Sequence, residues 1–387
     1  MGSLFDHDAV TAEARAADPA GLSRLFGTDE GLLPLWIAEP YLPLAPGVVA
    51  AVRERAEADW YGYEIRPRRI VEAFWAWATE RHGWAQDGLT TSVSPSVGTS
   101  IGVLLEQITA PDNGVILQPP VFTDFKPLIV SAGRRLIKNP LNLTSTGYRM
   151  DLEGLEAAAA DSRTTALILC NPHNPVGRVW TRDELAAVAA ICQRQGVFVI
   201  ADEIHADLAL ANHAFTPFAA VAAESGVRWA ATHGPIKTFG LAGVCDTLLI
   251  TDDEEAADLF RARSSQLHLT RNNVFALTAT EAAYTTGGPW VDDLMELAAA
   301  NFALLADDLP PGIKLVEPEG TYLAWLDFRD LGLDVPSLVA WLTAAGLALS
   351  PGHWFGREGA GFARMTIAAP TSQIEDAIGR LAAAVGR

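Results

Sequence analysis

The residues of this chain that could do chemistry follow short apolar runs. Asp202 comes directly after the apolar run 197–201, and an asparagine- and proline-rich turn, Cys170-Asn-Pro-His-Asn-Pro-Val-Gly177, follows the run 166–169. Lys237 lies shortly before the next apolar run. In an open parallel sheet, ligands bind outside the carboxyl ends of the strands. We therefore expect the acid, the asparagines and the lysine to surround a ligand at one edge of a sheet.

A segment nearer the N-terminus adds an anion-binding element to this set. Ser96-Val-Gly-Thr-Ser100 opens a helical pattern, and backbone N–H groups at such a Gly/Thr-rich helix start suit a phosphate. The site therefore has the groups to hold a phosphorylated ligand. One cluster of side chains resembles a set of metal ligands, although we expect no metal there. This cluster contains Asp202, Glu203, His205 and Asp207.

The alternation of apolar runs with helical patterns indicates the fold class. Four runs rich in branched residues are typical of strands buried on both faces of a parallel sheet: 115–117, 166–169, 197–201 and 247–250. Between two of them, Thr181-Arg-Asp-Glu184 forms a capping box and Gly196 ends a helix. Strand, helix and strand in this order predict βαβ units and an α/β fold.

The C-terminal part has a different order of elements. We predict strands at 322–328 and 364–367, and helices at 335–345 and from Ser372 onward. Such an order indicates a smaller α+β domain beside the sheet domain. The expected domains are an N-terminal arm that also joins the small domain (1–45), a large ligand-binding domain (46–285) and a small C-terminal domain (286–387).

Composition argues against several classes of function. The 387 residues include 28 Lys and Arg against 47 Asp and Glu, a formal net charge of −19, and 49% of the residues are hydrophobic. A chain this acidic repels nucleic acids and anionic membranes, so we expect neither as a partner. Its apolar content supports a packed core rather than disorder.

The termini and cysteines indicate the compartment. No apolar run approaches the roughly 18 residues of a membrane span, and the N-terminal MGSLFDHDAV lacks the basic start and apolar stretch of a signal peptide. Cys170, Cys192 and Cys245 have no CxxC spacing, which argues against disulfides and a zinc site. We expect a soluble, cytoplasmic protein.

The turn 171–177 resembles that of the fold-type-I pyridoxal 5′-phosphate enzymes, the aspartate aminotransferase superfamily (class I/II). Further segments are similar to cystathionine β-lyase-type carbon–sulfur lyases: Leu35-Trp-Ile-Ala38, Trp180, Asp202-Glu-Ile-His-Ala-Asp207, Gly320-Thr-Tyr-Leu-Ala-Trp-Leu-Asp327, Phe355-Gly and Phe362-Ala-Arg364. The likeness runs in order from about Leu35 to Pro370. It implies a mostly parallel central sheet in a large cofactor-binding domain, with a smaller α+β C-terminal domain.

The resemblance implies a role for each residue that faces the cofactor. Lys237 would form the Schiff base with the cofactor aldehyde and afterwards move protons at the substrate Cα. Asp202 would keep the pyridine nitrogen protonated, because a buried carboxylate stabilises an adjacent cation. Asn174 would donate to the phenolic oxygen, and His205 falls where many relatives place a Tyr against that oxygen.

It also implies contacts to the phosphate, the ring face and the substrate. Gly98 and Thr99 would bind the phosphate, and Phe122 would stack on the ring. Arg364 would bind the substrate α-carboxylate through two parallel hydrogen bonds, with Ala38 close to the substrate.

A homodimer with shared sites follows from the same resemblance. Tyr61 and Tyr63, in Trp60-Tyr-Gly-Tyr63, match the segment by which a partner subunit reaches the phosphate in this family. We favour Tyr63 for this role and for a contact to the substrate.

Several positions depart from the family pattern. Members commonly have Ser immediately before the Lys and three residues before it, where this chain has Ile236 and Gly234. A basic residue commonly follows eight or nine positions after the Lys, where this chain has Cys245 and Asp246. Glu39-Pro-Tyr41 replaces an Asp- and aromatic-rich stretch. The phosphate site thus loses polar partners, and a housekeeping role in cystathionine cleavage is not expected.

We predict a carbon–sulfur β-lyase that cleaves a cystathionine-like or cysteine S-conjugate substrate to a thiol, pyruvate and ammonia. An aminotransferase needs the same Lys, Asp and Asn, so it stays open as the alternative. The altered surroundings of Lys237 also leave open a relative in secondary metabolism that decarboxylates or oxidatively deaminates an amino-acid conjugate. A non-catalytic regulator on this fold is not expected, because the residues for chemistry are retained.

Overall fold

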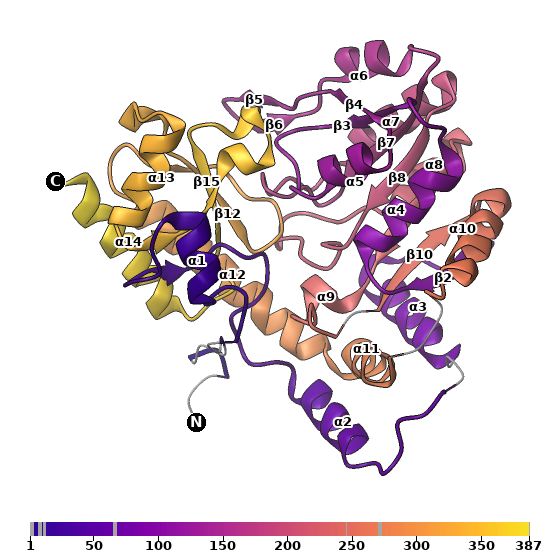
Figure 1. Ribbon diagram of the computed structural model, residues 1–387, viewed down its shortest axis with the longest axis horizontal. Coiled ribbons are helices and arrows are strands. Elements are labelled where there is room, and N and C mark those ends of the chain that lie inside the picture. Colours follow the sequence, from indigo (N-terminus) through magenta and orange to yellow (C-terminus); the bar gives the residue numbers. More distant parts are fainter. Residues whose placement is uncertain are drawn as a thin grey trace.

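A seven-stranded mixed sheet forms the centre of the larger part of the molecule (Figure 1). The computed structural model describes residues 4–6, 10, 13–64, 68–244, 246–269 and 273–386. The strand order is β2-β10-β9-β8-β7-β3-β4. The strands are β2 (Thr90–Ser94), β3 (Gly114–Leu117), β4 (Arg135–Lys138), β7 (Thr164–Cys170), β8 (Phe198–Asp202), β9 (Trp229–His233) and β10 (Thr247–Thr251).

The direction of the strands decides which chain segments meet at one edge. The pairs of β3 with β4, β3 with β7, β7 with β8, and β8 with β9 are parallel, whereas β10 is antiparallel to both β9 and β2. The carboxyl ends of the parallel strands and the amino end of β10 therefore lie at the same edge. The predicted α/β fold with a mostly parallel sheet is confirmed, whereas the reversal of β10 was not foreseen.

Alternating apolar residues along each strand bury the two faces of the sheet under different helices. Leu167 and Val199 belong to the cluster that contains Leu185 of α7, whereas Ile168 and Ile200 belong to the cluster that contains Leu104 of α4. Helices α6 (Leu152–Ala159), α7 (Arg182–Gln195) and α8 (Phe218–Ser225) contribute to the first cluster, and α4 (Val97–Ile108), α5 (Phe125–Ser131) and α10 (Glu254–Gln266) to the second. Burial on both faces explains why these strands are apolar at almost every position.

The predicted capping box at the start of α7 is present. Thr181 Oγ1 accepts a hydrogen bond from Glu184 N (3.2 Å), and Thr181 N donates to Glu184 Oε2 (2.9 Å). Gly196 ends the helix with φ 69°, in the left-handed region that favours glycine. Local sequence signals therefore fixed both ends of this helix.

A four-stranded antiparallel sheet lies in the C-terminal part, with the order β11-β12-β15-β14. The short strand β1 (Leu33–Pro34) pairs in parallel with β13 (Leu347–Ala348), so N-terminal residues pack with this part. The predicted domain boundaries themselves stay a prediction. The C-terminal elements are α12 (Gly288–Asp308), β11 (Lys314–Leu315), β12 (Leu323–Asp327), α13 (Val335–Ala344), β14 (Ser350–Pro351), β15 (Phe362–Thr366) and α14 (Thr371–Val385).

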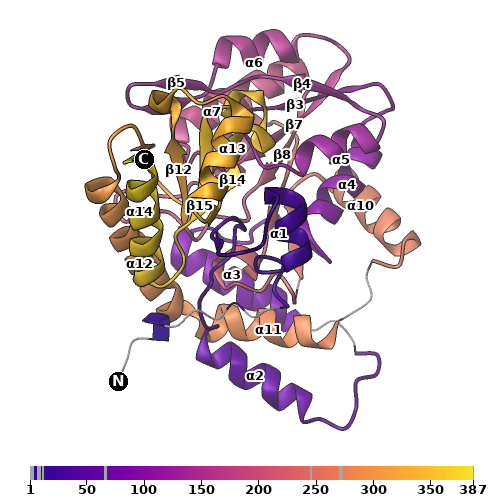
Figure 2. The same cartoon turned by 60° about the vertical axis from the view of Figure 1, so that its left-hand side comes forward.

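The remaining elements surround these two sheets. Helices α2 and α11 lie side by side at one end of the molecule, away from α6 (Figure 2). The other helices are α1 (Pro19–Phe26), α2 (Pro46–Ala56), α3 (Arg68–His82), α9 (Pro235–Thr238) and α11 (Val274–Thr286). A hairpin joins β5 (Asn142–Thr144) to β6 (Gly147–Arg149), and short 3-10 turns are η1 (Leu4–Asp6), η2 (Arg329–Leu331), η3 (Gly352–Phe355) and η4 (Arg357–Gly359).

Cys170 and Cys192 are buried thiols without a disulfide, and Cys245 lies outside the described residues. In the portion of the chain that the structure describes, no helix combines the length and the apolar character needed to cross a membrane.

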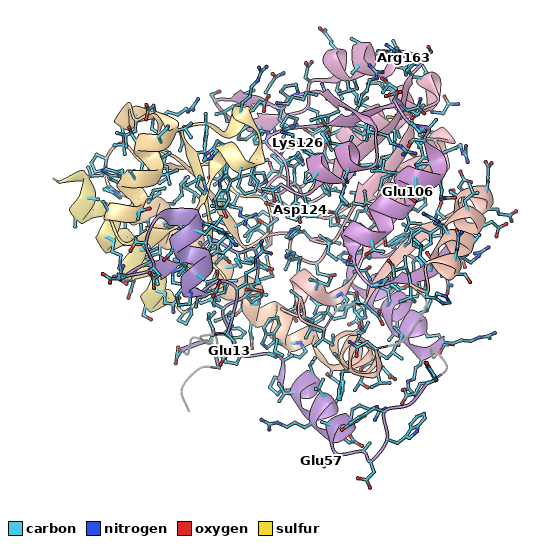
Figure 3. All side chains as sticks on the ribbon, viewed as in Figure 1. Glu13, Glu57, Glu106, Asp124, Lys126 and Arg163 are labelled. Atoms are coloured by element: carbon cyan, nitrogen blue, oxygen red, sulfur yellow. The ribbon has the colours of Figure 1, made fainter. Side chains whose placement is uncertain are left out.

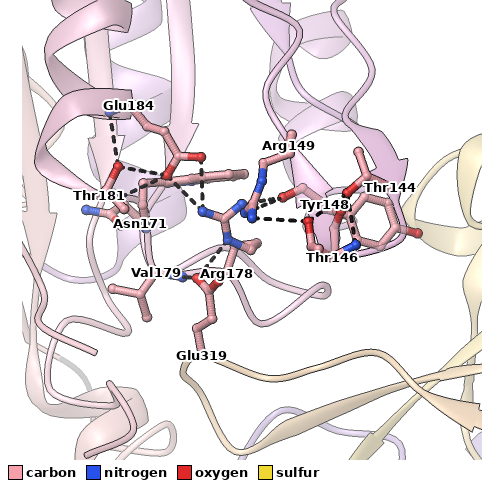
Figure 4. Close-up of polar contacts among 12 residues, drawn as sticks. Thr144, Thr146, Tyr148, Arg149, Asn171, Arg178, Val179, Thr181, Glu184 and Glu319 are labelled. Atoms are coloured by element: carbon pink, nitrogen blue, oxygen red, sulfur yellow. Dashed lines mark hydrogen bonds and ion pairs between the residues drawn. The ribbon is translucent and has the colours of Figure 1, made fainter. Parts of the chain in front are cut away.

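A buried arginine connects the asparagine–proline turn to the C-terminal part (Figure 4). Arg178 Nε donates to Glu319 Oε2 (2.7 Å), and its Nη2 donates to Glu184 Oε2 (2.8 Å). The carbonyl of Gly177 accepts hydrogen bonds from the backbone N–H groups of Glu319 and Gly320, both at 2.9 Å. The turn is thereby held on one side by α7 and on the other by the segment that leads into β12.

Candidate active site

Lys237 lies in the one-turn helix α9, directly after the carboxyl end of β9. Its Nζ donates a hydrogen bond to the carbonyl of Ala38 (2.8 Å), and its own carbonyl accepts one from Tyr322 Oη (3.0 Å). The side chain lines two adjoining cavities of about 480 and 490 Å³. The predicted reactive lysine therefore faces a space large enough for a cofactor and a substrate.

Asp202 ends β8 in the wall of the same space. The carboxylate is buried, and among the described residues its hydrogen bonds come from Thr232 Oγ1 (3.0 Å) and Ile204 N (3.3 Å), both to Oδ1. The other oxygen, Oδ2, therefore remains for a ligand. Burial raises the pKa of Asp202 to about 6, although these two hydrogen bonds and the charge of Lys237 act in the opposite direction. A cationic ring nitrogen beside Asp202 would compensate its buried negative charge.

His205 and Asn174 lie on the wall of the cavity that contains Asp202. Within the described chain, the buried His205 Nδ1 has no hydrogen-bond partner. Burial and the charges of Lys237 and Arg364 lower the pKa of His205, so its imidazole is neutral at neutral pH. Asn174 Oδ1 accepts from Arg364, which leaves its amide N–H groups for an acceptor in the cavity.

Arg364, in β15, lines the second cavity together with Lys237. Its Nη2 donates to the carbonyl of Trp36 (2.8 Å), its Nη1 donates to Asn174 Oδ1 (3.0 Å), and its guanidinium lies 4.8 Å from the Phe355 ring. The buried Nε has no hydrogen-bond partner in the described part of the chain. Burial lowers the pKa of Arg364 to about 10, so the group stays cationic at neutral pH and can bind a carboxylate.

The start of α4 lies at the cavity where we predicted an anion site, with one difference at Thr99. Gly98 lines the cavity, and the N-cap Ser96 lies beside it. Thr99 N donates to Ser96 Oγ (3.1 Å), so the cap occupies a backbone N–H that we expected to bind phosphate. Thr99 does not itself line the cavity, and the N–H groups at the first turn of the helix remain for an anion.

At one of the positions near Lys237 where the chain departs from the family pattern, the structure leaves little room for the usual residue. A Cβ on Gly234 would lie 3.1 Å from Thr247 Cγ2 and 3.2 Å from the carbonyl of Asp246, so β10 leaves little room for a Ser there. Ile236 is buried and lines the cavity, where a hydroxyl would meet the ligand. Cys245 lies outside the described residues.

Other predicted residues differ in where the structure places them. Ala38 and the half-buried Phe122 line the space around Lys237, as expected for contacts to substrate and ring. Tyr61 and Tyr63 line neither cavity and are exposed, with 52% and 87% of their surfaces accessible. Tyr61 instead donates to the carbonyl of Ala56 and packs on Phe275. A contact of either tyrosine with a partner subunit therefore stays a prediction.

Two charged residues that line the cavities were missed from the sequence, and a third, Glu39, was noted only as a departure from the family pattern. Arg15 and Asp124 line both cavities, and Figure 3 shows Asp124 between the parts of the molecule that contain the two larger sheets. Glu39 lines the cavity that contains Arg364, and burial raises its pKa, although the charges of Lys237 and Arg15 oppose this shift. Arg15 and Asp124 lie in no recognisable motif, so only the folded chain reveals their place.

The acidic residues next to Asp202 do not form a metal site. In the described ranges, no group of three or more His, Cys, Asp or Glu side chains is arranged to hold a metal ion. Glu203 instead accepts from His233 Nε2 (2.8 Å) and from Phe218 N (2.7 Å) inside the protein.

Comparisons with known proteins lead to the same family as the site geometry. The family model for aminotransferase class I and II matches residues 71–381. Cystathionine β-lyase PatB of Bacillus subtilis is 35% identical over 366 residues, which cover 93% of this chain and 94% of that protein. A pyridoxal-phosphate-bound protein of Clostridium difficile 630 has a TM-score of 0.92 at 34% identity and covers 98% of this chain and 99% of its own.

A pyridoxal-phosphate-bound C–S lyase of Staphylococcus hominis has a TM-score of 0.90 at 26% identity, over 100% of this chain and 98% of its own. The resemblance inferred from the turn 171–177 is confirmed by these matches. With its family model and its relatives extending over most of its length, this chain belongs to the aminotransferase class I and II family.

Proposed function

We propose that the protein is a pyridoxal 5′-phosphate-dependent carbon–sulfur β-lyase acting on a cysteine S-conjugate or cystathionine-like amino acid. The observation that carries the proposal is that Lys237 faces two adjoining cavities that are lined by different polar residues. One contains Asp202, Asn174, His205 and Gly98, and the other contains Arg364. The relative PatB, described as a cystathionine β-lyase, supports the same reaction.

The first cavity has the donor set that a phosphorylated pyridine aldehyde needs. Asp202 Oδ2 would bind the ring nitrogen, the Asn174 amide would donate to the phenolic oxygen, and His205 Nδ1 is a buried atom still lacking a partner among the described residues. The start of α4 at Gly98 would hold the phosphate, and Phe122 would cover the ring. The residues present therefore fit the cofactor.

When bound, the cofactor would serve as an electron sink for the pair left at the substrate Cα. Arg364 would bind the substrate α-carboxylate through its free guanidinium donors and so fix the Cα beside Lys237. Lys237 Nζ would accept the Cα proton, after which the thiolate leaves from Cβ. Asp202 would keep the ring nitrogen cationic throughout, because its charge is buried against it.

Transamination is the second candidate. It requires the same lysine, acid and asparagine and differs in where the proton returns. The Clostridium difficile relative is provisionally described as an aminotransferase, which favours this alternative over decarboxylation or oxidative deamination of an amino-acid conjugate.

We also propose that the enzyme works as a homodimer in which Tyr63 reaches the site of the partner subunit. Tyr63 is 87% exposed and has no place in the cavities of its own chain, which supports a role across an interface.

The decisive experiment incubates the cofactor-loaded enzyme with L-cystathionine and a panel of S-alkyl-cysteines. Thiol, pyruvate, carbon dioxide and keto acids derived from the whole substrate are measured together. Equal amounts of thiol and pyruvate are expected. A keto acid that retains the sulfur substituent would instead identify transamination, and carbon dioxide would identify decarboxylation. The Lys237→Ala protein serves as the inactive control.

A further inference from the structure

A largely buried carboxylate outside the two cavities forms a hydrogen bond with the turn that carries Lys237. Asp207, in the loop after β8, accepts hydrogen bonds from Trp77 Nε1 (2.8 Å), His82 Nε2 (2.8 Å) and Thr238 Oγ1 (2.7 Å). Trp77 and His82 belong to α3, whereas Thr238 is the residue directly after Lys237. The carboxylate therefore joins a long helix to the reactive turn.

The three donors keep Asp207 ionised. Burial alone would raise its pKa, but the hydrogen bonds from His82, Thr238 and Trp77, with the charge of His82, hold the pKa below its ordinary value. A carboxylate accepts but does not donate, so His82 must carry a proton on Nε2. The His82 ring also packs edge-on against Phe215, with centroids 5.0 Å apart, which fixes its orientation.

The turn that carries Lys237 needs such an external support. Helix α9 has four residues, and its N-cap, Gly234, makes no side-chain capping hydrogen bond. So short a helix is not stable by itself, because one turn does not repay the entropy of its nucleation. Two side-chain contacts hold its last residues: Tyr322 Oη donates to the carbonyl of Lys237, and Thr238 donates to Asp207.

We propose that Asp207 is a positioning residue for Lys237 and acts through the hydroxyl of Thr238. Together with Tyr322, it fixes the peptide from which the lysine side chain extends, and so fixes the path of Nζ toward the substrate Cα. The proposal rests on the proposed function in that Lys237 is taken as the reacting amine. A displacement of about 1 Å at a reacting group can cost about a hundredfold in rate.

The cleanest test removes only the hydroxyl. Thr238→Val keeps the shape of the side chain but cannot donate to Asp207. We expect kcat to fall by about ten- to a hundredfold with KM changed by less than about twofold, because substrate binding is left intact. Thr238→Ser restores the donor and should recover most of kcat. Asp207→Asn retains one acceptor oxygen, so its kcat should lie between those of Thr238→Val and Thr238→Ser.

The matched control is Trp77→Phe, which removes another hydrogen bond to the same carboxylate but keeps an aromatic ring against Phe239, the residue after Thr238. It should lower the thermal midpoint at least as much as Thr238→Val while leaving kcat within about twofold of the parent. If both variants lose kcat in proportion to their stability, Asp207 is only structural and the proposal is wrong. The proposal is equally wrong if Thr238→Val keeps the parental kcat.

A second readout does not depend on lyase activity. Cofactor-free protein is mixed with pyridoxal 5′-phosphate and a mild hydride donor, and the modified lysines are identified over time by mass spectrometry. Modification of Lys237 should be slower in Thr238→Val than in the parent, while Lys126 and Lys314 react alike in both proteins. Equal rates at Lys237 would overturn the positioning role. Absence of modification at Lys237 in the parent would instead overturn the proposed function.

Discussion

At the scale of single residues, the site combines buried charges with few hydrogen bonds. Asp202 and Arg364 are both buried, and burial shifts their pKa values toward the neutral forms, to about 6 and about 10 respectively. Such shifts are typical of functional sites, where a ligand supplies the missing counter-charge. Without a ligand, these buried charges lower the free energy of unfolding, and ligand binding would raise it again.

Asp202→Asn should therefore stabilise the cofactor-free protein, and increasingly so as the pH rises. The folded pKa of about 6 lies above the ordinary 3.8, so the folded state favours the protonated acid and loses stability between about pH 4 and 6. Asn keeps the acceptor for Thr232 and Ile204 but carries no charge. By the conversion of about 1.4 kcal/mol per pKa unit, the gain approaches about 3 kcal/mol at pH 7.5.

Urea unfolding of both cofactor-free proteins at several pH values measures this difference, since the titration of all other groups cancels. The advantage of Asp202→Asn should shrink as the pH falls toward 4. A difference that does not vary with pH would show that the carboxylate is not strained by burial.

Ile236→Ser should tighten cofactor binding. The side chain at 236 lines the cavity beside Lys237, where the parent offers no hydroxyl. A hydrogen bond to a charged phosphate contributes about 1.5–3 kcal/mol, which corresponds to about ten- to a hundredfold in affinity. Dialysis followed by titration with the cofactor gives both dissociation constants. Ile236→Val is the control and should bind like the parent; equal affinity of the Ser variant would mean that other residues already satisfy the phosphate.

At the scale of elements, the asparagine–proline turn depends on Arg178. This buried guanidinium contacts Glu184 in α7 and Glu319 before β12, and it lies 4.6 Å from the ring of Trp180 (Figure 4). The ion pairs thus join the element that carries Asn174, which lines the cavity, to the one that carries Tyr322, which bonds to the carbonyl of Lys237.

Arg178→Gln should lower the free energy of unfolding by about 3–5 kcal/mol, because removing one member of a buried ion pair leaves its partners uncompensated. Thr181→Ala is the matched control in the same segment, since it removes the cap of α7 and the hydroxyl bond to Glu184 but keeps both ion pairs of Arg178, and it should cost about 1 kcal/mol. Urea unfolding measures both losses. A loss for Arg178→Gln no larger than that for the cap would show that the arginine does not hold the turn.

The strands that the sequence predicted well are those whose apolar runs are buried on both faces, such as β7 and β8. Strand β9 was missed because Trp229-Ala-Ala-Thr-His233 is less apolar and carries no turn signal. The reversal of β10 could not be predicted, because strand direction depends on how the chain crosses between distant segments. The long helix α12 was also missed.

The residues of the candidate site that follow the ends of strands could be predicted from the sequence. Lys237, Asp202 and Asn174 follow strands or lie in a recognisable motif, so their order in the chain implied a common edge. Arg15 lines both cavities from a segment without a recognisable motif. Asp207 lies in the family-like segment 202–207, but its contacts with α3 and α9 join segments far apart in the sequence, which no local pattern marks. The role of Tyr63 at a partner subunit stays a prediction.

At the scale of the whole molecule, a shared site can be tested by mixing two inactive proteins. Lys237→Ala lacks the reactive amine, and Tyr63→Ala lacks the side chain that would reach the partner. In a mixed dimer, one site would receive an intact Lys237 from one subunit and an intact Tyr63 from the other. Random reassociation should therefore restore about a quarter of the parental activity.

The activity of the mixture after brief treatment with a mild denaturant, compared with each protein alone, gives the answer. Sedimentation analysis provides the control that dimers have formed again. Dimers without recovered activity would contradict a site shared through Tyr63.

The contacts of Lys237 also decide when its surroundings can form during protein synthesis. Its Nζ bonds to Ala38, which lies 199 residues earlier in the chain, and its carbonyl bonds to Tyr322, which lies 85 residues later. A ribosome-bound chain that ends before Tyr322 lacks the second contact, and one that ends before Arg364 also lacks a wall of the cavity beside Lys237. The surroundings of Lys237 are thus complete only when nearly the whole polypeptide has been synthesised.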